Sequence, residues 1–149
     1  MAAGPEVTAL RTLFGELLGT PDGSAHIAGV LAGSDVRYEV GDSHRLSGYF
    51  VPDFVLDDGR RVAELLHSGR PMLLDLSGGG CADAITGWRE RLEVTVATSA
   101  ERPAAALLIR PDGYVAWAAD EFANADRDRL RDALQRWFRP DGELDALSA

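Results

Sequence analysis

The single cysteine, Cys81, is the residue of this sequence best suited to covalent chemistry. It follows Ser77 and three consecutive glycines, and Asp75 stands six positions before it inside an apolar run. A thiol at the start of a helix is favoured as the thiolate, which is its nucleophilic form. A carboxyl beneath that thiol could carry its proton. The residues therefore suit a thiol site with Cys81 as the nucleophile and Asp75 as the proton shuttle.

Both residues also have a structural interpretation, which we favour. A lone buried thiol packs like a small apolar side chain, and a buried carboxylate is usually satisfied by backbone N–H groups or water. A chain with one cysteine cannot run a dithiol–disulfide cycle by itself. A monothiol redox protein that uses Cys81 stays open as the alternative.

Two further features are candidates for ligand binding. The glycines at 78–80, of which Gly79 and Gly80 lie next to the thiol, could form an anion nest at a helix start. Trp117 lies near an open end of the predicted sheet and could line a pocket for an aromatic ligand. We expect no metal, because the histidines are scattered without a second ligand four residues away. These histidines are His26, His44 and His67. We also expect no bound cofactor, because the glycines come with no lysine, no Walker spacing and no Rossmann pattern.

A strand and a helix are predicted on either side of Cys81. Residues 72–76 are apolar apart from Asp75, which indicates a short strand buried on both faces. The glycines at 78–80 allow a sharp turn without a side-chain clash. Apolar residues then recur at helical spacing and predict a helix that begins at Cys81: Ala84, Ile85 and Trp88.

The rest of this domain follows from similar patterns. Residues 93–98 alternate in polarity and residues 106–109 form another buried run, so both segments predict strands. Pro, Asp and Gly at 111–113 predict the turn of a hairpin whose second arm is 114–118. An amphipathic helix at 124–138 closes the domain with three inward-facing residues: Leu130, Leu134 and Trp137.

Two helices are expected ahead of the domain. Residues 7–18 carry one apolar stripe at the 3.6-residue period, and this stripe must pack on something. A second, shorter helix follows and is stopped by Gly33. Residues 36–40 alternate Val, Tyr and Val, which fits either a strand or an extended linker.

An extended entry leads from this linker into the domain. Residues 46–56 predict a short strand followed by a turn at 57–59, and a short helix at 62–66 ends at Gly69. The predicted order is thus two helices and then β, α, β, α, β, β, β, α. This order is typical of an α/β, thioredoxin-like fold, a mixed sheet sandwiched by helices, here with an N-terminal helical lead-in.

We divide the 149 residues into three segments. Residues 1–40 are the helical lead-in and linker, residues 41–139 are the thioredoxin-like domain, and residues 140–149 are a flexible tail. A chain of this length can bury roughly 68–70% of its unfolded surface, which is enough for a core without metal or disulfide.

Composition narrows the function classes. The net charge is −9 and all 15 basic residues are arginine, so nucleic acid is an unfavourable partner and lysine Schiff-base chemistry is excluded. No export signal and no apolar run of the roughly 18 residues that span a membrane is present, which predicts a cytoplasmic protein without a membrane partner. Richness in Ala, Arg, Gly and Asp indicates a high-GC bacterial genome, such as an actinobacterial one.

Two stretches resemble a known family. VPDFVLDDGRRVAELLHSGRPMLLDLSGG at 51–79 and ALLIRPDGYVAWA at 106–118 look like the C-terminal thioredoxin-like domain of FAD-dependent aromatic hydroxylases that act on polyketides such as angucyclines and anthracyclines. The most specific part is RPDGYVAWA at 110–118. The lead-in is similar to the helices that join the substrate domain to this last domain, so the resemblance spans about 4–138.

The resemblance implies recognition more than catalysis. In that family FAD and substrate bind in the preceding domains, whose motifs are absent from this sequence, so no flavin-binding residue can be carried over. Thioredoxins place a second cysteine three positions after the first, where this chain has Ala84. We therefore expect a redox-degenerate accessory or binding protein of aromatic polyketide (antibiotic) biosynthesis. Its partner would be a flavin-dependent oxygenase, a polycyclic aromatic intermediate or a second copy. The alternative is a stand-alone enzyme acting on a polyketide quinone or epoxide.

Overall fold

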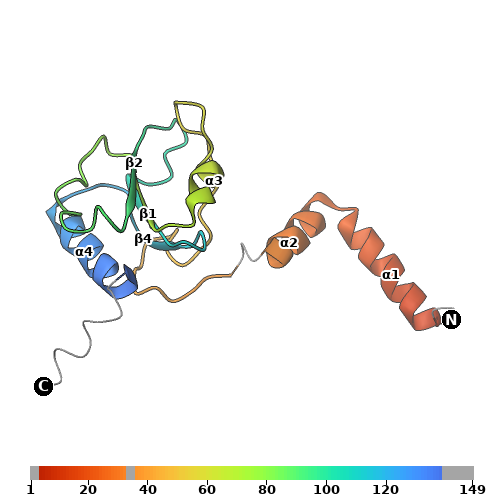
Figure 1. Cartoon of the computed structure of the whole chain (residues 1–149). Coiled ribbons are helices and arrows are strands. Elements are labelled where there is room, and N and C mark those ends of the chain that lie inside the picture. Colours follow the sequence, from red (N-terminus) through yellow and green to blue (C-terminus); the bar gives the residue numbers. More distant parts are fainter. Residues whose placement is uncertain (1–3, 33–35, 139–149) are drawn as a thin grey trace, which may run out of the picture. The chain divides into compact units, whose positions relative to one another are not determined.

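The chain divides into two compact units, residues 1–36 and residues 37–149. The structure is a computed structural model, and it describes residues 4–32 and 36–138 (Figure 1). The tail expected at 140–149 and the helix stop expected at Gly33 lie outside the described residues.

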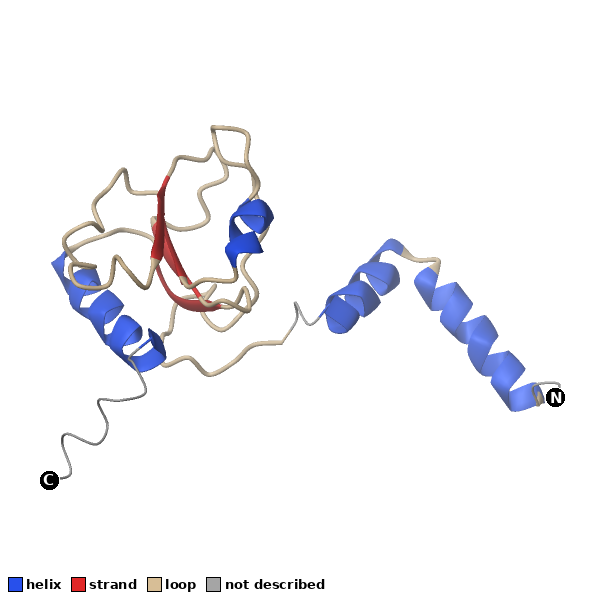
Figure 2. Cartoon of the chain, in the orientation of Figure 1, coloured by secondary structure: helices blue, strands red, loops and turns tan. Residues whose placement is uncertain are grey.

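Helices α1 (Pro5–Leu18) and α2 (Pro21–Ala32) make up the first unit and pack against each other. Each begins with a proline, whose fixed φ suits the first helical position. The Thr20 hydroxyl accepts a hydrogen bond from the Gly23 N–H at 3.1 Å and so caps the start of α2. Both helices predicted ahead of the domain are confirmed (Figure 2).

The apolar stripe of α1 is exposed within this unit. None of its residues is buried, and six large apolar side chains are 46–61% exposed. An isolated helix of this length is marginal in water, and most helical stability in proteins comes from packing an apolar face. The six residues, called the α1 stripe below, are Val7, Leu10, Leu13, Phe14, Leu17 and Leu18.

A four-stranded mixed sheet forms the centre of the second unit. Its strands are β1 (Met72–Asp75), β2 (Glu93–Val96), β3 (Ala106–Ile109) and β4 (Val115–Ala119), in the order β2-β1-β3-β4. The pair β1 and β2 is parallel, and the other two pairs are antiparallel. β1, β3 and β4 are buried along their whole length, as their apolar runs predict.

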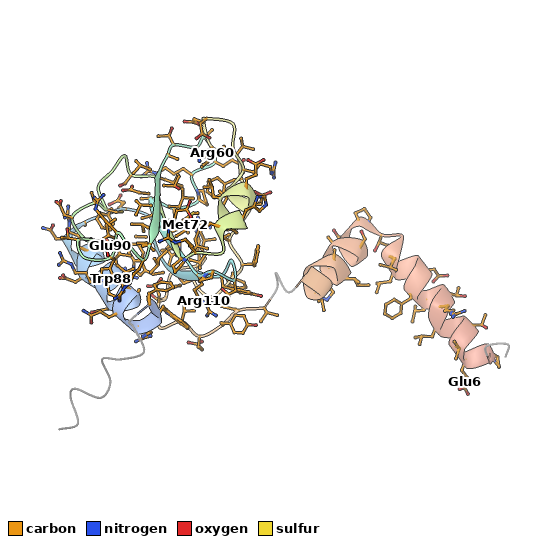
Figure 3. The ribbon with its side chains drawn as sticks, in the orientation of Figure 1. Glu6, Arg60, Met72, Trp88, Glu90 and Arg110 are labelled. Carbon is orange, nitrogen blue, oxygen red and sulfur yellow. The ribbon has the colours of Figure 1, made fainter. Side chains whose placement is uncertain are left out.

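Helices cover both faces of this sheet, and Figure 1 shows α3 and α4 on opposite sides. One face packs on α3 (Val62–Leu65) and the segment 51–56, and the other packs on α4 (Asn124–Phe138). Met72, which is fully buried, belongs to the first of these two clusters (Figure 3). The predicted thioredoxin-like mixed sheet sandwiched by helices, with N-terminal helices before it, is confirmed.

The short helix before β1 has the predicted stop. α3 continues as the single turn η1 (Leu66–Ser68), and Gly69 follows in the left-handed conformation with φ 62°. The turn glycines Gly59 and Gly113 also have positive φ, 87° and 83°, at the two predicted turns.

The prediction of a helix that begins at Cys81 is wrong. Residues 80–91 form successive turns in which the Ala84 N–H bonds to the Cys81 carbonyl and the Trp88 N–H to the Ile85 carbonyl, each spanning three residues. Gly87 has φ 89°, a left-handed conformation that an α-helix cannot contain. The apolar residues still face the core, and Ile85 is fully buried.

The strand predicted in the entry segment does not form as a ladder. Residues 46–56 take part only in single bridges, Phe50 with Tyr114 and Val55 with Arg61, and residues 36–40, expected as a strand or a linker, form no strand. Pro52 lacks the N–H that a ladder would need at its position. The segment instead bonds to the hairpin, where the Val51 N–H donates to the Gly113 carbonyl at 2.9 Å.

Candidate functional site

The candidate site is the loop that joins β1 to Cys81. β1 ends at Asp75, and Gly78 and Gly79 then take left-handed φ values of 87° and 100°, which only glycine adopts at little cost. This turn brings Cys81 back over the end of β1. The Cys81 N–H donates a hydrogen bond to Asp75 Oδ2 at 3.0 Å.

The Asp75 carboxylate is fully used by this loop. Its Oδ1 accepts hydrogen bonds from the Ser77 N–H at 2.8 Å and the Ser77 hydroxyl at 2.6 Å, and its Oδ2 accepts from Cys81. The residue is 1% exposed. Burial is the largest single influence and raises the pKa of Asp75, but the bonds from Ser77 and Cys81 together outweigh it, so the pKa is lowered. Asp75 is an ionised structural anchor for the loop.

The Cys81 thiol is closed to solution and held in its protonated form. It is 1% exposed, and burial, with the neighbouring Asp75 charge as the next cause, raises its pKa to about 12. The expectation that a helix dipole would favour the thiolate is wrong, because no helix begins here and the nearest charge is negative. At neutral pH the Cys81 thiol is therefore not in the thiolate form that acts as a nucleophile.

Trp117 and the loop glycines do not share a cavity. Trp117 is 1% exposed and lines a hollow of about 130 Å³ together with Val40, Asp42 and Arg129. Gly79 and Gly80 are not among its lining residues, and Phe122 contacts Trp117 edge-on with ring centroids 6.3 Å apart. Pockets for drug-sized ligands measure roughly 300–1,000 Å³, so this hollow is too small for a polycyclic aromatic molecule.

The residue that the sequence reasoning missed is Asp42. Its carboxylate accepts hydrogen bonds from the Ser47 hydroxyl at 2.5 Å, the Ala118 N–H at 3.3 Å and the Arg129 guanidinium at 2.5 Å. Burial raises its pKa, and the bonds from Ser47 and Arg129 more than compensate, so the pKa is lowered. Asp42 thereby ties the entry segment to β4 and α4. No local motif signals this contact, since Arg129 lies 87 positions away.

Neither of two hollows in the described residues fits the flavin that the resembled family binds in its preceding domains. FAD is larger than the drug-sized ligands that fill pockets of roughly 300–1,000 Å³, and the Trp117 hollow holds about 130 Å³. A second hollow of about 400 Å³ is open to solvent and has no aromatic wall. It is lined by Arg37, Glu39, Gly41, Asp42 and Ser43. We therefore derive no flavin chemistry from this chain's own residues.

Residues 4–32 and 36–138 contain neither a candidate metal site nor a candidate membrane span. No cluster of three or more His, Cys, Asp or Glu side chains there could hold a metal ion. None of the helices in these ranges has the length and apolar character needed to cross a membrane.

Fold and site together define a class of protein: a thioredoxin-like domain whose redox corner holds one buried, protonated thiol. Residues 44–141 match the family model described as the C-terminal domain of aromatic-ring hydroxylases. The chain belongs to this family, as the resemblance in the sequence predicted.

Whole hydroxylases match most of this chain. The anhydrotetracycline monooxygenase of Streptomyces rimosus is 37% identical over 91% of this chain and 29% of its own length. The rifampicin monooxygenase of Streptomyces venezuelae is 33% identical over 93% of this chain and 27% of its own length. The chain thus spans less than a third of these curated relatives.

Solved structures give the same result. The OxyS anhydrotetracycline hydroxylase from Streptomyces rimosus is similar with a TM-score of 0.70 and 37% identity, over 91% of this chain and 30% of its own. CabE, an aromatic hydroxylase from angucycline biosynthesis, has a TM-score of 0.67 and 38% identity, over 93% of this chain and 30% of its own.

The match extends beyond the family domain. The family model begins at residue 44, and the 9% of the chain that OxyS leaves uncovered is shorter than the 43 residues before that point. At least part of the helical unit therefore lies in the region shared with whole hydroxylases.

Proposed function

We propose that this chain is a non-catalytic binding domain that acts with a flavin-dependent oxygenase in aromatic polyketide biosynthesis. The observation that carries this proposal is the closed loop between Asp75 and Cys81. The thiol is buried with its pKa raised to about 12, and the carboxylate is occupied by Ser77 and the Cys81 N–H. Because the loop between Asp75 and Cys81 offers neither a thiolate nor a free carboxylate, we infer that the domain acts by binding and not by catalysis.

The α1 stripe is the surface that we propose contacts the oxygenase. Six apolar side chains that are 46–61% exposed exceed what a two-helix unit can cover by itself. At least part of this helical unit lies in the region matched by hydroxylases that are more than three times as long as the matched part. We propose as the partner the remainder of such a hydroxylase, the part outside the region that this chain matches.

The other candidate functions have less support. A polycyclic aromatic ligand needs more room than the 130 Å³ beside Trp117. A thiol enzyme or monothiol redox protein needs a Cys81 that reaches its substrate as the thiolate, and this residue is 1% exposed.

Activity assays on the purified full chain test the proposal. We expect no turnover of a disulfide or a peroxide above that of a Cys81→Ser variant, and no flavin absorbance in the purified protein. Turnover at enzymatic rates that the Cys81→Ser variant loses would show a thiol enzyme instead. A bound yellow cofactor would equally contradict a pure binding role.

A further inference from the structure

The outer edge of β2 is open. β2 pairs with β1 on one side, where the Glu93 N–H donates to the Pro71 carbonyl and the Ala97 N–H to the Asp75 carbonyl. Because successive residues of a strand point their backbone groups to opposite sides, Val94 and Val96 direct theirs away from β1. Among the described residues no other strand pairs with this edge.

One neighbouring segment closes the edge just beyond its end. The Thr98 carbonyl, which also points away from β1, accepts a hydrogen bond from the Asp57 N–H at 2.9 Å. Residues 57–59 then turn back, and the Leu56 N–H bonds to the Arg60 carbonyl. The free length of the edge is therefore the stretch from Val94 to Val96.

β2 is short and begins with a charged residue, but it lacks other features that protect an edge strand. Its sequence, Glu-Val-Thr-Val, contains no lysine and no proline, and its pairing with β1 has no bulge. Three of the four residues are β-branched and favour a strand. Val96 is also 55% exposed, so an apolar side chain accompanies the free backbone groups.

We propose that β2 pairs with β2 of a second copy of this chain in antiparallel orientation. With Val94 opposite Val96 of the second copy, both residues of each strand direct their free groups at the partner, which gives four backbone hydrogen bonds. The two-fold axis then passes between the two Thr95 residues, a favourable cross-strand pair. Glu93 lies opposite Ala97 of the second copy, so no like charges face each other.

Two oppositely charged residues beyond the ends of β2 are also placed favourably by the antiparallel pairing. Arg91, two residues before β2, and Asp57, beside Thr98, are both exposed and lie at opposite ends of the edge. The antiparallel two-fold brings Arg91 of one copy toward the Asp57 turn of the other. This self-complementarity favours a second copy as the occupant over an unrelated extended peptide. The inference goes beyond the proposed function, which uses the α1 stripe, so either can fail without the other.

Disulfide trapping of the full chain tests the register. A Thr95→Cys variant places two thiols across the axis in a non-hydrogen-bonded pair, whose Cα separation of about 4.5 Å suits a disulfide. We expect a covalent dimer under mild oxidation. The wild-type chain, whose Cys81 is buried, and a Glu93→Cys variant are the controls, and neither should cross-link. Equal cross-linking at position 93 would overturn the register.

Analytical sedimentation of the full chain, without the added cysteines, tests whether the β2 edge is the dimer interface. Val96→Lys should weaken dimerisation about tenfold because it buries a charge beside an apolar edge, and Val96→Thr should leave it nearly unchanged. Arg91→Asp should also weaken the dimer, and adding Asp57→Arg should restore it. A chain that stays monomeric, or a dimer that tolerates Val96→Lys, would refute the proposal, as would capture of extended peptides in place of self-association.

Discussion

The Cys81 N–H donates a hydrogen bond to Asp75 Oδ2 at 3.0 Å, so the carboxylate that could serve the thiol as a proton shuttle holds the backbone of the thiol's own residue. Two further bonds from Ser77, and one from the Cys81 side chain, also hold this carboxylate. The corner where a thioredoxin-like fold would do redox chemistry is here a structural turn.

Replacing Asp75 should therefore cost stability. Asp75→Asn keeps the shape but puts an amide donor against the Cys81 N–H or gives up the Ser77 bonds. We expect the free energy of unfolding to fall by about 2 kcal/mol, the size of one lost bond to a buried charge. Urea denaturation measures it. Asp83→Asn is the matched control, because the Asp83 side chain is 87% exposed and should leave stability unchanged.

Acid gives an independent check on the same carboxylate. The pKa of Asp75 is lower in the folded chain than the ordinary 3.8. Ionised Asp75 therefore adds stability above pH 3.8, and that contribution is lost as the pH falls through the folded value. The stability difference between wild type and Asp75→Asn should be full at pH 6 and narrow as the pH drops below 3.8. A constant difference would show that the charge of Asp75 plays no part.

The Cys81 thiol should resist alkylation while the chain is folded. Its folded pKa of about 12 lies above the ordinary 9.0, so protonation stabilises the fold below pH 9 and this contribution disappears as the pH rises through 12. At pH 8 we expect iodoacetamide to modify Cys81 slowly in buffer and rapidly in urea, as followed by intact mass. Rapid modification of the native chain would mean that the loop opens.

The buried strands were predictable because continuous apolar runs bounded by turn residues leave few alternatives. β1 follows from an apolar run interrupted only by Asp75, β3 from a continuous four-residue run, and the turn at Gly113 from the residues before it. The apolar residues after Cys81 also face the core as expected. The predicted helix does not form, because apolar residues spaced three to four apart fit successive turns as well as an α-helix. The left-handed φ of Gly87 is compatible with the turns and not with the helix.

The site was less predictable than the fold. The pKa of Cys81 depends on whether a helix or a carboxylate lies nearest, and no sequence pattern states that. The bond between Asp42 and Arg129 joins residues 87 positions apart, which only the tertiary structure brings together. The wrong expectation of a Cys81 thiolate and the missed role of Asp42 both depend on contacts between elements, which the sequence pattern of a single element does not contain.

Arg129 should matter more than its neighbours on α4. Arg129→Met leaves the nearly buried Asp42 carboxylate without its cation, and we expect a loss of about 1–2 kcal/mol in unfolding free energy. Arg131→Met removes an exposed pair with Asp128 and should cost less than about 0.5 kcal/mol. Thermal or urea unfolding compares the two variants. Equal losses would mean that Asp42 does not anchor the entry segment.

The most direct test of a binding role is calorimetric titration of the full chain against OxyS from which the region matching this chain has been removed. We predict saturable binding that Leu10→Ser with Leu13→Ser weakens at least about tenfold, since each buried leucine contributes roughly 1.5–3 kcal/mol. Thr12→Ala, on the opposite face of α1, should bind like wild type. No binding, or binding indifferent to the two leucines, would contradict the account.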